Sequence, residues 1–296
     1  MCPIFVNFTA KIDVREEVWG VTKLRNEIYV LCRPLTSTPH SVLVFEDWNP
    51  FHLKKKIEVN EIQEVCDVRP SEKGNCLYIS DPREKCIWKL TREAGDQHKY
   101  VKWLTTNYTP KTLSVSSDGQ LVVVSKAKSV LTIYGPDAEL IRSIPLPPDI
   151  KNPIHAVETS VGNFNILHEW KEEEEGESGS SSGTKREMWT VSELTRDGQM
   201  VTRRFIPSDK TQQLNSPRYL SLDSDDRVFV ADYWNHAVIL LESDLKWKQI
   251  ICPTNEKEEK KIRWPHRLCY DEENKQLIVV GNTIGQGVNV YTLNRR

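Results

Sequence analysis

The sequence lacks the marks of several protein classes. Its seven cysteines include no Cys-x-x-Cys pair, and their odd number suits neither a disulfide framework nor a zinc ribbon. No apolar run approaches the roughly 20 residues needed to span a bilayer, and the first residues do not resemble a secretion signal. Lysine and arginine (40) nearly balance aspartate and glutamate (42), which argues against a strongly basic nucleic-acid-binding protein. We therefore expect a cytoplasmic protein with reduced thiols that does not bind membranes.

A repeat runs through the 296 residues. Each copy opens with Pro or Val and continues as a short alternating stretch, a polar turn and a run of Val, Ile and Leu. The opening positions are Val18, Val65, Pro110, Pro153, Pro217 and Pro265. They are 43 to 48 residues apart, except for one spacing of 64 that contains 17 residues rich in Glu, Gly and Ser. We predict that this stretch, 171–187, is a flexible acidic insertion.

The repeat predicts the fold. Stretches with period-2 alternation are separated by turn residues such as Ser117-Asp-Gly119, and helical periodicity is missing. Units of about 45 residues with three or four strands are typical of propeller blades, and a ring of blades buries both faces of each sheet. We predict one all-β domain over residues 1–296, a six-bladed β-propeller whose last blade is closed by the N-terminal strand. The predicted blades are 18–62, 63–106, 107–149, 150–212, 213–260 and 261–296 plus 4–12.

The fifth unit carries a recognisable signature. Its segment Val230-Ala-Asp232-Tyr-Trp-Asn235-His236-Ala-Val238 resembles the NHL repeat, named after Asn-His-Leu, and the second unit has a weaker copy around Asp81. The chain is similar to the C-terminal propeller of tripartite-motif proteins, without their RING, B-box and coiled-coil segments. The resemblance implies structural turn roles for Asp232, Asn235 and Asp81. It also implies a platform that binds protein or, in some members, single-stranded RNA.

The openings of the innermost strands supply candidate binding residues. In a propeller these positions crowd around one end of the central channel. They combine cations with aromatic side chains: Trp19, Lys111, His155, Arg218, Tyr219, His266 and Arg267. Aromatic residues with arginine are typical of protein-binding hot spots, and they also suit stacking of unpaired bases.

Motifs for chemistry are sparse. The sequence has no G-x-S-x-G elbow and no P-loop, and its seven histidines form no His-x-His pair. Among the aligned strand openings only Asp67 is acidic, so we expect no metal and no cofactor. His155 and His266 could meet at the channel and bind a metal, although bonds to water or backbone are the favoured interpretation.

These observations predict a non-catalytic interaction scaffold, not an enzyme, that binds a protein or peptide on one propeller face. Single-stranded RNA binding by the same face is the alternative, and a channel-site metal-dependent hydrolase or lyase is the second alternative. Recruitment of substrates to a ubiquitin ligase would require a separate partner.

Overall fold

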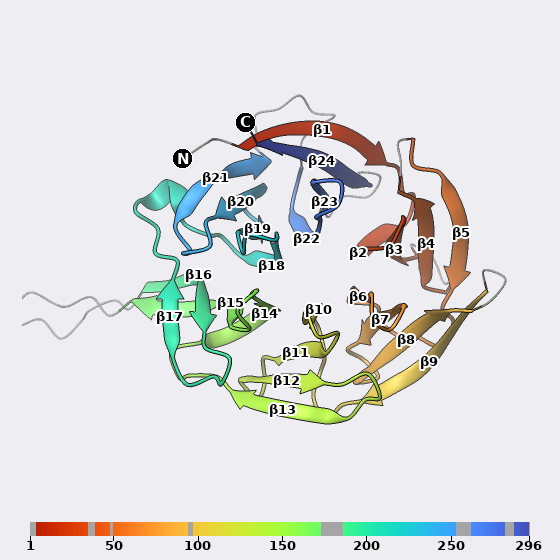
Figure 1. Ribbon diagram of the computed structural model, residues 1–296, viewed down its shortest axis with the longest axis horizontal. Coiled ribbons are helices and arrows are strands. Elements are labelled where there is room, and N and C mark those ends of the chain that lie inside the picture. Colours follow the sequence, from red (N-terminus) through yellow and green to blue (C-terminus); the bar gives the residue numbers. More distant parts are fainter. Residues whose placement is uncertain are drawn as a thin grey trace, which may run out of the picture.

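The computed structural model describes residues 4–34, 39–47, 50–93, 97–172, 186–252, 262–281 and 287–295. These residues form six four-stranded sheets arranged as blades around a central channel (Figure 1). The prediction of an all-β, six-bladed β-propeller is therefore confirmed. The helical element among the described residues is one 3-10 turn, η2 (Lys210–Gln212). In this part of the chain we find no helix with the length and apolar character needed to cross a membrane.

Each blade places four antiparallel strands from the channel outward (Figure 1). The innermost strands are β2 (Glu17–Leu24), β6 (Asp67–Ser71), β10 (Leu113–Val115), β14 (Lys151–Glu158), β18 (Pro217–Leu222) and β22 (Pro265–Asp271). The second strands are β3 (Glu27–Arg33), β7 (Cys76–Asp81), β11 (Leu121–Ser125), β15 (Phe164–Glu172), β19 (Val228–Asp232) and β23 (Gln276–Gly281). The third strands are β4 (Ser41–Glu46), β8 (Cys86–Arg92), β12 (Val130–Tyr134), β16 (Arg186–Leu194), β20 (Ala237–Leu241) and β24 (Val288–Arg295). The outermost strands are β5 (Leu53–Glu58), β9 (His98–Thr105), β13 (Leu140–Pro145), β17 (Val201–Arg204), β21 (Trp247–Cys252) and β1 (Ile4–Ile12).

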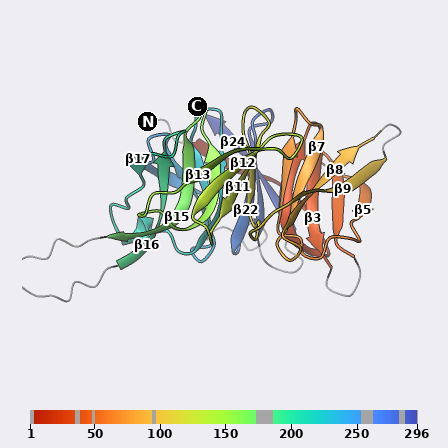
Figure 2. The ribbon, with the colours of Figure 1, turned by 90° about the horizontal axis from the view of Figure 1, so that it is seen from below.

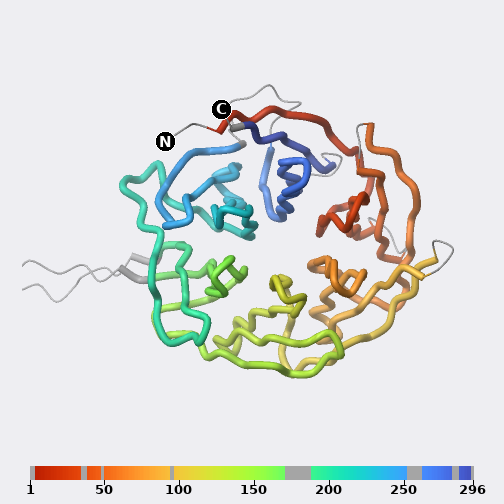
Figure 3. The backbone as a smooth tube through the Cα atoms, viewed as in Figure 1, coloured from red at the N-terminus to blue at the C-terminus, as the bar shows by residue number. Residues whose placement is uncertain are grey.

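The sixth blade joins both ends of the chain. Strand β1 pairs antiparallel with β24, from Ile4 opposite Arg295 to Ile12 opposite Val288. The N- and C-terminal ends therefore lie side by side (Figure 3). Because Ile4 and Ile12 are buried, this pairing also contributes apolar contacts.

The hydrophobic core lies between blades. Six clusters of buried apolar residues occur in the described chain, one for each pair of neighbouring blades. Strands covered on both faces are apolar throughout, as in β20 with its sequence Ala-Val-Ile-Leu-Leu. The outer strand β5, Leu-Lys-Lys-Lys-Ile-Glu, is mostly exposed, and lysines on an edge strand oppose pairing with another chain.

The fourth blade carries the predicted insertion. Strands β15 and β16 continue into it, with Lys171 opposite Glu187 and Glu172 opposite Arg186, so both ends of the predicted flexible segment are strand. The predicted flexible segment was too long at both ends, because charged residues at the end of a hairpin can still form the backbone hydrogen bonds of the sheet. The hairpin extends away from the body of the propeller (Figure 2). Residues 173–185 lie outside the described part of the chain.

The signature residues brace turns. Asp232 accepts hydrogen bonds from the Asn215 backbone N–H at 2.8 Å and from the Asn235 side-chain amide at 2.7 Å. In the second blade, Asp81 accepts from the backbone N–H of Gln63 at 2.9 Å. Each aspartate thus connects the segment entering its blade to the turn between the second and third strands.

Candidate functional site in the central channel

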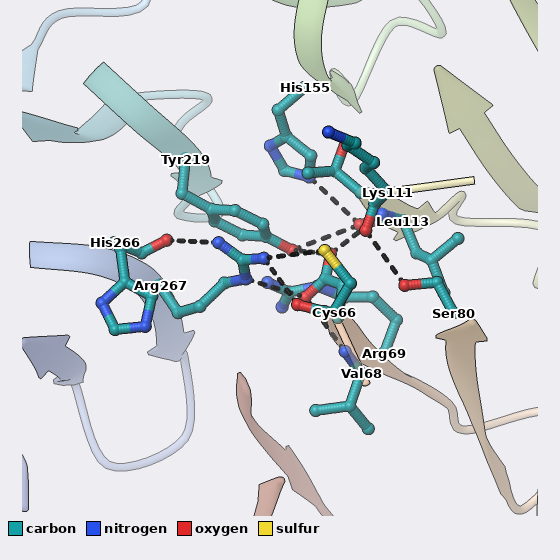
Figure 4. Close-up of polar contacts among 12 residues, drawn as sticks. Cys66, Val68, Arg69, Ser80, Lys111, Leu113, His155, Tyr219, His266 and Arg267 are labelled. Atoms are coloured by element: carbon teal, nitrogen blue, oxygen red, sulfur yellow. Dashed lines mark hydrogen bonds and ion pairs between the residues drawn. The ribbon is translucent and has the colours of Figure 1, made fainter. Parts of the chain in front are cut away.

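Tyr219 reaches across the channel to two other blades. Its hydroxyl, on β18, donates to Asp67 Oδ2 on β6 at 2.9 Å and lies 3.2 Å from the Leu113 carbonyl oxygen (Figure 4). Burial raises the pKa of Tyr219 well above its ordinary value, so the hydroxyl keeps its proton and acts as a donor. We call Asp67, His155, Tyr219 and Arg267 the closing layer.

His155 supports the tyrosine ring from the fourth blade. The two rings are stacked with centroids 3.9 Å apart. Nδ1 of His155 accepts from the Leu220 backbone N–H at 3.2 Å, and Nε2 is 3.0 Å from the Leu113 carbonyl oxygen. These partners define a neutral imidazole with its proton on Nε2. Burial lowers the pKa of His155 well below its ordinary value, in agreement with that assignment.

Two arginines lie against the Tyr219 ring, and one of them, Arg267, pairs with the buried Asp67 carboxylate. Arg267 Nε lies 3.3 Å from Asp67 Oδ1, and its Nη2 donates to the Cys66 carbonyl oxygen at 2.6 Å (Figure 4). Arg69 lies over the Tyr219 ring at 4.5 Å and donates to the Leu268 carbonyl oxygen at 3.2 Å. Asp67 balances one of the two guanidinium groups, so the closing layer and Arg69 together carry one positive charge, because His155 is neutral.

One cavity occupies the channel beside the closing layer, on the side where the inner strands end. Its volume is about 680 Å³, within the ~300–1,000 Å³ typical of small-molecule sites. Arg69, His155, Leu220 and Cys269 line its inner end. The C-terminal halves of all six inner strands and the turns after them contribute the remaining walls, including Thr22, Lys23, Ser114, Ser116, Glu158, Ser221, Tyr270 and Asp271.

The predicted binding residues do not form one accessible surface. Tyr219, His155, His266 and Arg267 are buried, and their side chains point into the channel or bond to backbone. The expectation of exposure was wrong for these four, because side chains that face the narrow channel meet partners from other blades. Lys111 and Arg218 are exposed, and Trp19 is half-buried.

The exposed candidates have local partners. The Arg218 guanidinium lies over the Tyr233 ring at 5.1 Å, and Trp19 contacts the His266 ring edge-on at 6.5 Å between centroids. His266 Nε2 lies 3.1 Å from the Val18 carbonyl oxygen. Burial lowers the pKa of His266 to about 3, so this imidazole is neutral.

The comparison of the six strand openings in the sequence missed Arg69. It stands two residues after the strand opening at Asp67, and alternate residues of a strand face the same side. The same offset from other openings leads to Thr22, Ser114, Ser221 and Cys269, which all line the cavity. Reading each inner strand two residues further would therefore have identified five residues of the cavity wall, although not which of them contact one another. Within the described residues there is no group of three or more His, Cys, Asp or Glu placed to hold a metal.

No protein-family model and no curated protein matches this sequence. Solved structures match its fold. Hydrazine synthase of Kuenenia stuttgartiensis is 12% identical with a TM-score of 0.62, and 97% of each chain is covered. Virginiamycin B lyase of Staphylococcus aureus is 11% identical with a TM-score of 0.62, covering 99% of this chain and 100% of that chain. An auxiliary nutrient binding protein of Bacteroides thetaiotaomicron is 12% identical with a TM-score of 0.63, covering 99% of this chain and 77% of that chain.

At this level of identity the similarities show the propeller fold alone. The prediction of a non-catalytic interaction scaffold rested on resemblance to one propeller family. The comparisons contradict it, because the matching structures named above include a lyase and hydrazine synthase and give no support to a similarity with tripartite-motif proteins. The expectations about catalysis, protein or RNA partners and cytoplasmic location stay predictions.

Proposed function

We propose that this protein binds a small organic anion in the channel cavity, with Arg69 receiving the negative charge. The observation that carries the proposal is the position of this guanidinium and its missing hydrogen bond. It lines the inner end of the cavity, and its Nε is buried without a hydrogen-bond partner among the described residues.

The charge balance supports an anion. The carboxylate nearest to the two arginines, Asp67, already accepts hydrogen bonds from Val68, Leu113 and Tyr219 and is paired with Arg267. Arg69 is half-buried, and its buried Nε without a hydrogen-bond partner or a carboxylate of its own is costly, a cost that an anionic ligand offsets. Carboxylates suit this role because a guanidinium can donate two parallel hydrogen bonds to them.

The comparisons offer an analogy for a small-molecule site. One matching propeller is named an auxiliary nutrient binding protein, and virginiamycin B lyase was solved with quinupristin in a catalytically inactive variant. The analogy supports a ligand of small-molecule size in a propeller of this fold. The choice of an anion rests on Arg69 and not on these neighbours.

A finer family assignment belongs to the same proposal. The second and fifth blades are NHL-type repeats, an assignment supported by the way Asp81 and Asp232 accept backbone N–H groups from the segments that enter their blades. These turns lie away from the cavity walls.

Binding can be tested with a panel of small organic acids screened by saturation-transfer NMR. We expect at least one acid to bind the wild-type protein and to bind Arg69→Met at least about tenfold more weakly, as expected for loss of a charge-assisted hydrogen bond. The matched control is Arg218→Met, which removes the same charge from the exposed opposite end of the channel. Failure of every acid to bind, or equal binding by Arg69→Met, would contradict the proposal.

A further inference from the structure

The geometry of the cavity points to a class of ligand, an inference that rests on the proposed function: the bound anion is a polyhydroxylated monocarboxylate, the chemistry of a sugar acid. The carboxylate would lie at Arg69, and the ligand hydroxyls would lie against a belt of serine side chains between Arg69 and the mouth of the cavity.

Three serines form this belt, which consists of Ser114, Ser116 and Ser221 from the third and fifth blades. Ser114 Oγ is buried and has no hydrogen-bond partner in the described part of the chain. Ser116 Oγ accepts from the Gln120 backbone N–H at 3.0 Å, and Ser221 Oγ accepts from the Tyr270 backbone N–H at 3.2 Å. Among the described residues none of the three hydroxyl protons has an acceptor, so each can be donated to a ligand oxygen.

Unpaired hydroxyls in a cavity wall favour a hydroxylated ligand over an apolar one. A buried polar group without a partner costs roughly 1–3 kcal/mol, and an apolar ligand would leave that cost in place. A ligand hydroxyl both donates and accepts, and therefore matches a serine hydroxyl whichever way its proton points.

The charges around the cavity favour one negative charge on the ligand. The closing layer and Arg69 together carry one uncompensated positive charge. The other cations in the wall are Lys23, Arg25 and Lys73, and five carboxylates of the same wall outnumber them: Glu72, Glu158, Asp271, Glu272 and Glu273. Lys73 lies 3.7 Å from Asp118. Lys23 is paired with Asp47 at 2.6 Å and with Asp271 at 2.7 Å. It is therefore neutralised and does not favour a second anionic group.

The mouth of the cavity favours a monocarboxylate over a dicarboxylate. Its carboxylates Glu72, Glu158, Glu272 and Glu273 outnumber the cations Arg25 and Lys73, and this excess of negative charge would repel a second anionic group such as that of a dicarboxylate. Glu158 Oε2 accepts from the Ser117 backbone N–H at 3.0 Å, and carboxylate oxygens in this position can accept further bonds from ligand hydroxyls. A cationic inner end, a hydroxyl belt and an acidic mouth thus match a monocarboxylate with a neutral, hydroxylated body.

Isothermal titration calorimetry with three kinds of probe tests this inference. Glucuronate, galacturonate and gluconate carry one carboxylate and several hydroxyls; cyclohexanecarboxylate carries the charge without hydroxyls; glucose carries hydroxyls without the charge. We expect at least one of the three hydroxylated acids to bind at least about tenfold more tightly than either comparison compound.

The serine belt is tested by Ser114→Ala/Ser221→Ala, checked for a native circular dichroism spectrum. We expect about tenfold weaker binding of the preferred hydroxylated acid, and unchanged binding of cyclohexanecarboxylate, which reports on any general damage to the cavity. The control Ser243→Ala changes an exposed serine outside the cavity and should leave all affinities unchanged.

The failures are distinguishable. If cyclohexanecarboxylate binds as tightly as the hydroxylated acids, or if the serine variant binds them normally, the inference is overturned while binding at Arg69 stands. If none of these acids binds but another acid of the larger panel binds through Arg69, the ligand class alone is wrong. If no acid binds at all, the proposed function fails as well.

Discussion

The Tyr219 hydroxyl and the Asp67 carboxylate are 2.9 Å apart, although 152 residues separate them in the sequence. Their hydrogen bond connects the fifth blade to the second across the channel. It also holds Asp67 between Tyr219 and Arg267, so the charge balance at the inner end of the cavity depends on this contact.

Removing the Tyr219 hydroxyl should weaken the whole ring. Tyr219→Phe keeps the ring stacked on His155 but leaves the buried Asp67 oxygen without one donor. We expect a loss of about 1–3 kcal/mol in the free energy of unfolding, measured by urea denaturation. Tyr100→Phe, on the outer strand β9, is the matched control and should change stability by less than about 0.5 kcal/mol. Equal losses of unfolding free energy in the two variants would show that the hydrogen bond between Tyr219 and Asp67 does not stabilise the protein.

Asp67 and Arg267 should be energetically coupled. Asp67→Asn leaves the buried Arg267 and the half-buried Arg69 without a carboxylate, and we expect it to cost about 3–5 kcal/mol. The double variant Asp67→Asn/Arg267→Met removes the excess charge again. Its destabilisation should be smaller than the sum of the two single effects by about 1–3 kcal/mol in a double-mutant cycle. Strict additivity would mean that the 3.3 Å contact does not determine the charge balance.

Much of this architecture could be predicted from the sequence, and the site could not. The spacing of the repeat openings reports blade number directly, because each blade is one supersecondary unit of about 45 residues. Period-2 alternation likewise shows which residues face inward. It does not show which inward side chains meet, because the partners of Tyr219 lie on blades far away in the chain. The burial of His155 and the position of Arg69 depend on the same contacts across the channel.

Stability should fall in mild acid because of buried histidines. Burial lowers the pKa of His266 to about 3, that of His168 to about 4 and that of His155 in the same direction. A histidine with a lowered pKa binds a proton less readily in the folded state than in the unfolded chain. Its contribution is therefore fully present above the unfolded pKa of about 6.5 and is lost as the pH falls below it, at about 1.4 kcal/mol per pH unit for each group.

The variant His266→Gln isolates one of these groups, since the glutamine amide can still donate to the Val18 carbonyl oxygen. Between pH 6 and pH 4 the dependence of unfolding free energy on pH should become shallower by about 1.4 kcal/mol per pH unit. His52→Gln, at an exposed position before β5, should keep the wild-type slope. An unchanged slope in His266→Gln would mean that this imidazole is not held neutral in the folded protein.

The signature aspartate should matter for stability and not for binding. Asp232→Ala removes the acceptor of the Asn215 backbone N–H and of the Asn235 amide, and we expect it to cost about 1–3 kcal/mol in thermal or urea unfolding. Affinity for any acid that binds through Arg69 should stay within about twofold, because this turn is not part of the cavity wall. A large loss of affinity in a folded Asp232→Ala protein would place the ligand elsewhere.

The most direct test of ligand binding at Arg69 is an NMR titration of the arginine Nε–Hε resonances with the acid that binds best. Binding should shift one resonance strongly, and that resonance should be missing from the spectrum of Arg69→Met and present in that of Arg218→Met. Such a shift would place the anion on Arg69, whose Nε is buried without a hydrogen-bond partner among the described residues. A titration that leaves the Arg69 resonance in place, or that shifts only Arg25 or Arg218, would contradict the account.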